Sequence, residues 1–258
     1  MKEFFGFGGY QREPEGYFSW QHILFVTILM VIMFSLAIFF GRKNKDLSEE
    51  KKNKVLIVSA ILIDSFELIK IIIMCFRNNT IETCLYELPL FLCSIQLITI
   101  PLAAFSKGKV REASLDFVLI FGLLGAVLGT YLAGNNYSSY PVLSVDNVIS
   151  GITHCISGFC ALYIGISKMC SMKKENILIT NLILFVFCLT AYIVNHIVDY
   201  NYMFLVRGDG TPYDIIYNLV NGNQIIYPII VVVLFFGYIT LFYYIYFLIL
   251  KKVNERRS

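Results

Sequence analysis

Long apolar stretches separated by short polar segments form the dominant pattern along this chain. Read with a window of about 19 residues, the pattern predicts seven membrane-spanning helices in a single integral membrane domain over residues 1–258. Their approximate ranges are 20–41, 54–76, 87–105, 113–133, 145–167, 176–198 and 224–250. Pro89 and Pro101 lie near the ends of the third, whose length still covers a bilayer with little tilt. The expected fold class is therefore all-α, a polytopic membrane protein.

Composition supports this interpretation and excludes a water-soluble globule. Hydrophobic residues make up 57% of the chain and charged residues only 15%, with a mean hydropathy of +0.69. Soluble proteins carry roughly a quarter of their residues as Asp, Glu, Lys or Arg. The longest polar segments, 1–19 and 199–223, do not make a convincing soluble domain. The net charge of +3 does not indicate nucleic-acid binding, because the basic residues follow the membrane topology.

Basic residues predict the orientation of the spans, since Lys and Arg are retained on the cytoplasmic side. Sixteen of the 21 Lys and Arg residues fall in one set of alternate segments, namely 42–54, 107–111, 168–174 and 251–257. The other set contains only Lys2, Arg12, Arg77 and Arg207. We therefore expect the N-terminus outside, the C-terminus in the cytoplasm, and a location in the cell membrane.

The chain has seven cysteines, an odd number, and most lie inside predicted spans. They do not form a disulfide framework of the kind found in small secreted domains. Cys75 and Cys84 both fall on the predicted outer side, where pairing would be possible, but we expect them to be unpaired.

Ionisable residues inside spans are functional candidates by default, because charge is expensive in hydrocarbon. The second predicted span holds Asp64, Glu67 and Lys70, each three residues from the next. This spacing predicts one stripe along a helix, on which Glu67 and Lys70 can pair. The pair could fix helix packing or belong to a functional site.

Further polar residues lie in four other spans and near their ends. They are Cys93 and Gln96 in the third, His154 in the fifth beside Gly151 and Gly158, Asn195, His196 and Asp199 at the end of the sixth with Asn201 and Tyr202 after it, and His22 at the start of the first. With a helical rise of about 1.5 Å per residue, Cys93 lies roughly 9 Å and His154 roughly 13 Å below the outer boundary. The two Gly residues beside His154 would let another helix approach closely. This shared depth predicts one polar cavity that opens toward the outside.

A thiol beside an imidazole is the minimal nucleophile and base for acyl transfer, because the imidazole can take the thiol proton. Asn195, Asp199 or Glu67 could orient the imidazole, and Gln96, Asn195 or Tyr202 could donate to an oxyanion. Two histidines with an acid could instead hold a metal. No local motif supports either interpretation. Taken alone, Cys93 is more typical of a buried small hydrophobe, and His154 could be a packing residue.

The segments Phe18–His22, Leu88–Ser94, Gly151–His154 and Asn201–Leu205 resemble the bacterial YwaF-like integral membrane proteins. These are related to the animal transmembrane-protein-164 acyltransferases, and the similarity covers most of the chain. The resemblance implies a lipid acyltransferase in which Cys93 carries the acyl group and His154 activates it. It also implies phospholipids and lysophospholipids as partners, with no need for an acyl-CoA. We expect no cofactor and no metal. Water could replace the lysolipid, which would make the protein an acyl-ester hydrolase.

One position departs from the bacterial pattern. Members of that group often have a His two residues before the Cys, where this chain has Phe91. This departure puts in question how completely the acyl-transfer site is equipped.

Two other functional classes remain open from the sequence. A small-solute transporter or binding protein could use Asp64, Glu67 and Lys70 in the outer half of the membrane, although inverted repeats, typical of transporters, are not visible. A metal-dependent hydrolase could use His22, His154 and His196. A purely structural subunit would leave the shared depth of the polar residues unexplained.

Overall fold

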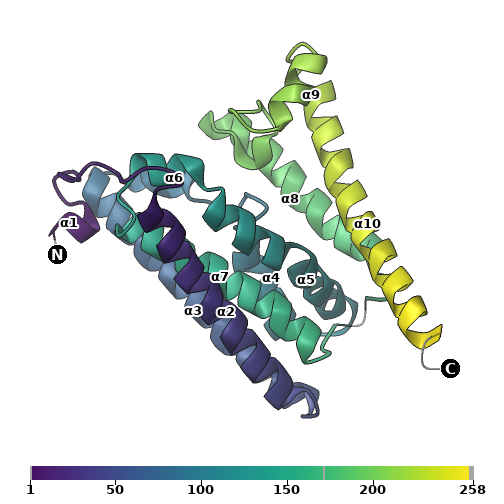
Figure 1. Cartoon of the computed structure of the whole chain (residues 1–258). Helices are drawn as coiled ribbons and strands as arrows, with labels where there is room; N and C mark the ends of the chain where they lie inside the picture. The colour runs from purple at the N-terminus through teal and green to yellow at the C-terminus, as the bar shows by residue number, and fades with distance from the viewer. Residues whose placement is uncertain (1, 171, 256–258) are drawn as a thin grey trace. The chain divides into compact units, whose positions relative to one another are not determined.

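A computed structural model describes residues 2–170 and 172–255, which form helices and loops with no strand in that part of the chain (Figure 1). The described residues divide into two compact units. The first contains the chain up to Pro89 together with Gln96–Cys170, and the second contains Leu90–Ile95 together with the residues after Cys170. The predicted all-α class is confirmed.

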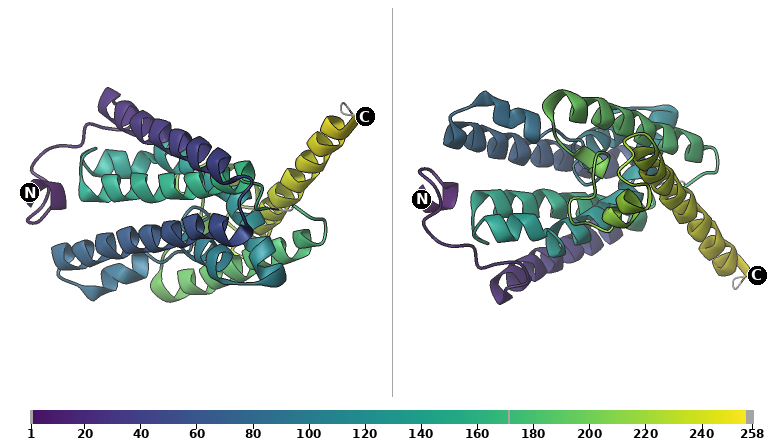
Figure 2. Two further views of the ribbon diagram at one scale, coloured as in Figure 1. Left: turned by 90° about the horizontal axis from the view of Figure 1, so that it is seen from below. Right: turned by 90° about the horizontal axis from the view of Figure 1, so that it is seen from above.

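Helix α7 is the central element of the first unit. The elements of this unit are α1 (Lys2–Phe5), α2 (Trp20–Asn44), α3 (Glu49–Asn78), the 3₁₀ helix η1 (Ile81–Tyr86), α4 (Gln96–Phe105), α5 (Gly108–Tyr131), α6 (Gly134–Ser139) and α7 (Val145–Ile166). The long helices α2, α3 and α5 all pack against α7, as Figures 1 and 2 show. Ser144 begins α7 by accepting a hydrogen bond from the Asn147 N–H.

Small residues allow α5 and α7 to approach each other closely. A Cβ on Gly122 of α5 would lie 2.8 Å from the Ser157 carbonyl oxygen and 2.9 Å from the Ala161 Cβ of α7. A Cβ on Gly158 of α7 would lie 2.6 Å from the Ala126 Cβ of α5. The expected close approach of another helix at Gly158 is therefore confirmed, and membrane helices commonly pack through such contacts.

The second unit is an antiparallel pair of long helices with a folded loop between them. Its elements after Cys170 are α8 (Asn176–Val198), the 3₁₀ helix η2 (Tyr202–Phe204), α9 (Tyr213–Leu219) and α10 (Ile226–Glu255). Thr180, early in α8, shares a hydroxyl–hydroxyl hydrogen bond of 3.0 Å with Tyr243, late in α10. Tyr227 at the start of α10 donates to the Phe204 carbonyl at 2.7 Å. The first contact joins the two helices, and the second joins the loop to α10.

Five helical segments of the described chain are long and apolar enough to cross a membrane. They are Trp20–Asn44, Gly108–Ser139, Val145–Ile166, Asn176–Val198 and Ile226–Lys252. Predicted spans one, four, five, six and seven coincide with these segments. The second predicted span falls on α3, which has 30 residues. This helix is not among the five, and it carries the charged residues Asp64, Glu67 and Lys70 along its apolar part.

The predicted third span is not one continuous helix, so the expected helix over 87–105 is wrong over its first half. Helix α4 begins only at Gln96 and has 10 residues, while the chain from Glu87 to Ile95 is irregular. Pro89 contributes to this break, since it lacks an N–H and disfavours helical geometry at the residue before it. At 1.5 Å per residue, α4 covers about 15 Å, half of a bilayer core.

The close contact at Gly122 leads to a stability prediction. We expect Gly122→Ala to lower the free energy of unfolding by about 1–3 kcal/mol, because its Cβ would press on backbone of α7. The matched control is Gly237→Ala in α10, whose Cβ would meet nothing within 4 Å. Denaturant unfolding in detergent measures both. Equal stability of the two variants would contradict the packing described here.

Candidate functional site

His154 lies on the face of α7 that packs against α5. Its imidazole covers Gly129, where an added Cβ would fall 2.6 Å from Nε2 and 2.7 Å from Nδ1. The side chain is half-buried, and neither ring nitrogen forms a hydrogen bond with any residue that the structure describes. The imidazole therefore keeps both nitrogens available in the helix bundle.

The predicted pair of Glu67 and Lys70 forms, and a third residue joins it. Lys70 Nζ lies 2.6 Å from Glu67 Oε1 and 3.1 Å from Glu87 Oε2. All three side chains are at least three-quarters buried. Two carboxylates thus enclose one ammonium within the first unit. Glu87 was not singled out in the sequence, although an acid at the boundary of an apolar stretch is a usable signal.

Asp64 takes no part in this network of described side chains. Six residues separate it from Lys70, which turns its side chain about a third of the way around α3. Asp64 is exposed and lines a groove of about 480 Å³ with α4 residues that include Leu97 and Pro101.

A second ionic cluster joins three segments at the ends of α3 and α7. The Arg77 guanidinium donates to both carboxylate oxygens of Asp146, at 2.7 and 2.8 Å, and lies 5.6 Å from the ring centres of Tyr10 and Tyr140. The Tyr10 hydroxyl donates to the same carboxylate at 2.5 Å. Burial, and then the Asp146 carboxylate, raise the pKa of Tyr10 above its ordinary value, so the phenol stays protonated and remains a donor. The cluster fixes the N-terminal segment to the bundle.

Sequence reasoning missed this cluster. The sequence held a usable signal in Asp146, which lies in the first turn of an apolar helix, where a buried acid needs a basic partner. Only four basic residues are predicted on the outer side, and Arg77 is one of them.

His22 is fully buried, and packing explains it completely. Its Nδ1 accepts from the Phe18 N–H at 3.1 Å, so the proton is on Nε2, which donates to the Thr130 carbonyl at 3.1 Å. The ring also stacks on Tyr137 with centroids 3.8 Å apart. Both nitrogens are thus engaged, unlike those of His154.

Gln96, the first residue of α4, holds a buried donor without a partner. Its Oε1 accepts from the Thr99 hydroxyl at 3.1 Å. Its Nε2 has no hydrogen-bond partner among the described residues, although the residue is fully buried. Such a group is costly to leave unsatisfied, so a ligand that accepts from it would be stabilised.

Two asparagines hold the loop of the second unit in shape. The Asn195 amide bonds both polar groups of the Tyr202 backbone, accepting from its N–H at 2.6 Å and donating to its carbonyl at 3.0 Å. Asn201 accepts from the Val206 N–H at 2.9 Å and donates to the Arg207 carbonyl at 2.8 Å. Both amides therefore hold the loop in shape. Met203 and Phe204, which lie in this loop, adopt left-handed backbone conformations.

Cys93 belongs to the second unit and lies on a turn. The Ile95 N–H donates to the Phe91 carbonyl at 2.9 Å, and the Ser94 hydroxyl accepts from the Phe91 N–H at 3.0 Å. Cys93 is half-buried within this turn. The Phe91 ring packs among Tyr200, Tyr202 and Phe204, with centroid distances of 6.2, 5.1 and 5.9 Å. Phe91 thus anchors the Cys93 turn to the loop that the two asparagines hold.

The remaining candidates, His196 and Asp199, are exposed at the end of α8. His196 packs on Tyr192 with a centroid distance of 4.5 Å, and Asp199 ends the helix in a left-handed conformation. In the described part of the chain, no three His, Cys, Asp or Glu side chains are placed to hold a metal ion. The metal-hydrolase alternative therefore gains no support.

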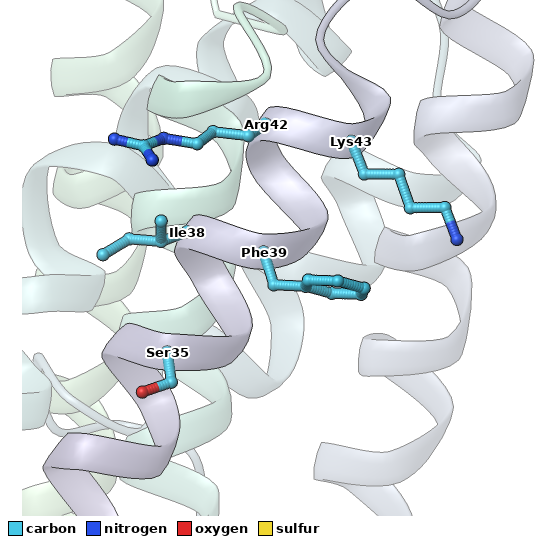
Figure 3. A pocket seen from close by; sticks show the side chains of 5 residues that line it. All are labelled: Ser35, Ile38, Phe39, Arg42 and Lys43. Atoms are coloured by element: carbon cyan, nitrogen blue, oxygen red, sulfur yellow. The ribbon is translucent and has the colours of Figure 1, made fainter.

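Another groove of the first unit lies along α2. Ser35, Ile38, Phe39, Arg42 and Lys43 line an open groove of about 540 Å³ (Figure 3). The Lys43 ammonium lies 5.7 Å from the centre of the exposed Phe39 ring. A basic group above an apolar surface at a helix end is typical of the membrane interface. Neither groove is lined by Cys93 or His154.

Comparison with known proteins gives one match. The model of the TMEM164 family matches residues 17–250, a range that includes both units and every candidate residue named above from His22 to Tyr202. The searches of curated proteins and of solved structures found no match.

The Arg77–Asp146 pair leads to a second stability prediction. We expect Asp146→Asn to lower the free energy of unfolding by about 3 kcal/mol, because it leaves a buried guanidinium without its counter-ion. The control is Lys251→Gln, which removes an exposed pair with Glu255 and should change stability by less than about 1 kcal/mol. Thermal unfolding in detergent compares them. An Asp146→Asn variant as stable as the control would show that the cluster does not hold the bundle.

Proposed function

The chain belongs to the TMEM164 family, and from this membership and the geometry of its two units we propose a multi-pass lipid acyltransferase of the YwaF-like group. Cys93 is the nucleophile and His154 the general base, acting on acyl esters of phospholipids in the cell membrane. Hydrolysis is the same reaction with water as the acceptor.

The proposed topology has seven spans, with the N-terminus outside and the C-terminus in the cytoplasm. The alternation of basic segments supports it. Helix α3, with 30 residues, is about 45 Å long and exceeds the hydrocarbon thickness. Its charged residues Glu67 and Lys70 are paired with each other, which is how charge is tolerated inside a membrane. The third span then combines the irregular chain from Glu87 with the short helix α4.

The break in this third span is the observation that carries the proposal. Non-helical backbone at membrane depth is tolerated only where protein buries it or where it lines a water-filled cavity. Cys93 lies on this broken segment rather than on a lipid-facing helix. A thiol in such a segment suits a nucleophile that must meet a polar ester group.

His154 suits the role of base because its nitrogens are free, whereas both nitrogens of His22 are bonded to backbone. Deprotonation by His154 turns the Cys93 thiol into a thiolate, which attacks the ester carbonyl carbon. The tetrahedral intermediate expels the lysophospholipid alkoxide, which takes the proton from the imidazolium, and a thioester remains. In the second half, His154 removes a proton from the acceptor hydroxyl, which attacks the thioester and releases the Cys93 thiolate. The thiolate takes that proton back from the imidazolium, which restores the starting thiol and imidazole.

Gln96 is the proposed oxyanion donor. Of the three donors expected from the sequence, the Asn195 amide is already bonded to the Tyr202 backbone, and Tyr202 is fully buried. The Gln96 Nε2 is the group with an unused proton. Preorganised donors of this kind stabilise the developing negative charge.

The other candidates act as positioning residues in this proposal. Glu67 and Lys70 brace the start of the third span through Glu87. Asn195, Asn201 and Tyr202 hold the loop on which Phe91 packs. His196 and Asp199, both exposed at the end of α8, would contact the lipid head group.

An activity test follows directly. With labelled phospholipid donor and lysophospholipid acceptor, we expect Cys93→Ala to abolish transfer and His154→Ala to reduce it by about 10²–10⁴-fold. Acyl-thioester protein should be detectable by mass spectrometry in the wild type and absent in Cys93→Ala. Cys170→Ala, which removes a thiol elsewhere, serves as the control and should keep its activity. Full activity of Cys93→Ala would exclude the covalent mechanism.

A second test asks whether the two units bring Cys93 and His154 together. We expect His154→Cys to form a disulfide with Cys93 on mild oxidation, because the reaction needs these side chains within contact distance. Mass spectrometry of the digested protein identifies the bond. The double variant His154→Cys/Cys93→Ser is the control. If the bond does not form in the single variant, Cys93 and His154 do not share a site.

A further inference from the structure

The chain reverses direction at the end of α3. Asn79 ends the helix in a left-handed conformation, and η1 then runs back along α3. The Asn78 amide donates to the Thr83 hydroxyl at 3.2 Å, which holds the reversal. This arrangement brings two cysteines together, with the Sγ atoms of Cys75 and Cys84 at 3.4 Å.

The environment of these two thiols suits reaction with a small molecule. Both are half-buried, as are Cys93, Cys155 and Cys170, whereas Cys160 and Cys188 are buried. The contact between their sulfurs is what makes this pair a candidate for a disulfide. A disulfide bond is about 2.05 Å long, so side-chain rotation must bring the sulfurs about 1.4 Å closer. In the proposed orientation this reversal lies outside the cytoplasm, where disulfides persist.

We propose that Cys75 and Cys84 form a reversible disulfide on the outer side of the membrane, which fixes η1 to the end of α3. A low-molecular-weight disulfide is the oxidant. One cysteine thiolate attacks it, forming a mixed disulfide and releasing one small thiol. The second thiolate attacks the protein sulfur of that mixed disulfide and releases the second small thiol. Two cysteine thiols are thereby oxidised, one small disulfide is reduced, and the two protons end on the released thiols.

The disulfide between Cys75 and Cys84 also constrains the position of Glu87, which belongs to the ion network around Lys70 in the first unit. The Cys84 carbonyl accepts from the Glu87 N–H at 3.3 Å, and the Glu87 carboxylate lies 3.1 Å from the Lys70 ammonium. A link from Cys75 to Cys84 therefore tethers Glu87 to the same helix that carries Lys70. The proposal depends on the orientation proposed above and does not depend on acyl transfer.

Differential alkylation of the full-length protein tests the bond. The protein is purified without reductant, treated with oxidised glutathione, alkylated with a first reagent, reduced, and alkylated with a second. We expect Cys75 and Cys84 to carry only the second label. Mass spectrometry of the unreduced digest should show Cys75 joined to Cys84 without glutathione in the wild type and in the control Cys170→Ser. In Cys84→Ser the resolving thiol is missing, so Cys75 should carry either the first label or a glutathione mixed disulfide. Reduction should lower the Tm of the wild type by roughly 5 °C and leave that of Cys75→Ser/Cys84→Ser unchanged.

Two outcomes would overturn the bond itself: a first label on both cysteines of the wild type, or a disulfide from either one to a different cysteine. Treatment of intact cells with reductants tests on which side of the membrane the disulfide lies. We expect a membrane-impermeant reductant to open it. A bond that yields only to a permeant reductant would overturn the outer location, and with it the proposed orientation, while leaving the acyl-transfer assay a separate question.

Discussion

The lack of water inside a bilayer is the constraint on which the architecture depends, because each charge and each backbone polar group must find its partner within the protein. In the proposed topology, the first unit meets this requirement by enclosing Lys70 between two carboxylates and by placing the Arg77 guanidinium on Asp146. The two clusters join α3 to the segment after it and to α7. The polar groups that could weaken a membrane bundle are therefore among the contacts that specify how its helices are arranged.

The same constraint explains which candidates are structural and which are chemically available. His22 and Asn195 are saturated by backbone groups, so their polarity is used for folding. His154 and Gln96 retain nitrogens without a protein partner in the described chain. An unsatisfied polar group lowers stability, and its retention is typical of positions where a ligand completes the hydrogen bonding. Among the described candidate residues, His154 and Gln96 therefore have nitrogens left to bind a ligand or transfer a proton.

The class of fold and five of the apolar helices follow from the sequence, since runs of about 20 apolar residues have few alternatives to a membrane helix. The Glu67–Lys70 pair also follows, because a spacing of three fixes the geometry within one helix. Glu87, Asp146 and the structural use of His22 did not follow, because each depends on contacts between segments distant in sequence. The break before Gln96 was indicated only by Pro89, and a single proline does not show where the helix resumes.

The insertion of Leu90–Ile95 into the second unit has a consequence for synthesis. Phe91 packs on Tyr202, yet 110 residues lie between them in the chain. At a synthesis rate of about 5–20 residues per second, the Cys93 turn waits for roughly 5–20 seconds before its partners exist. Contacts of such long sequence separation form late and slowly. The thiol therefore enters its final surroundings only after the whole of the first unit has been made, because that unit ends at Cys170.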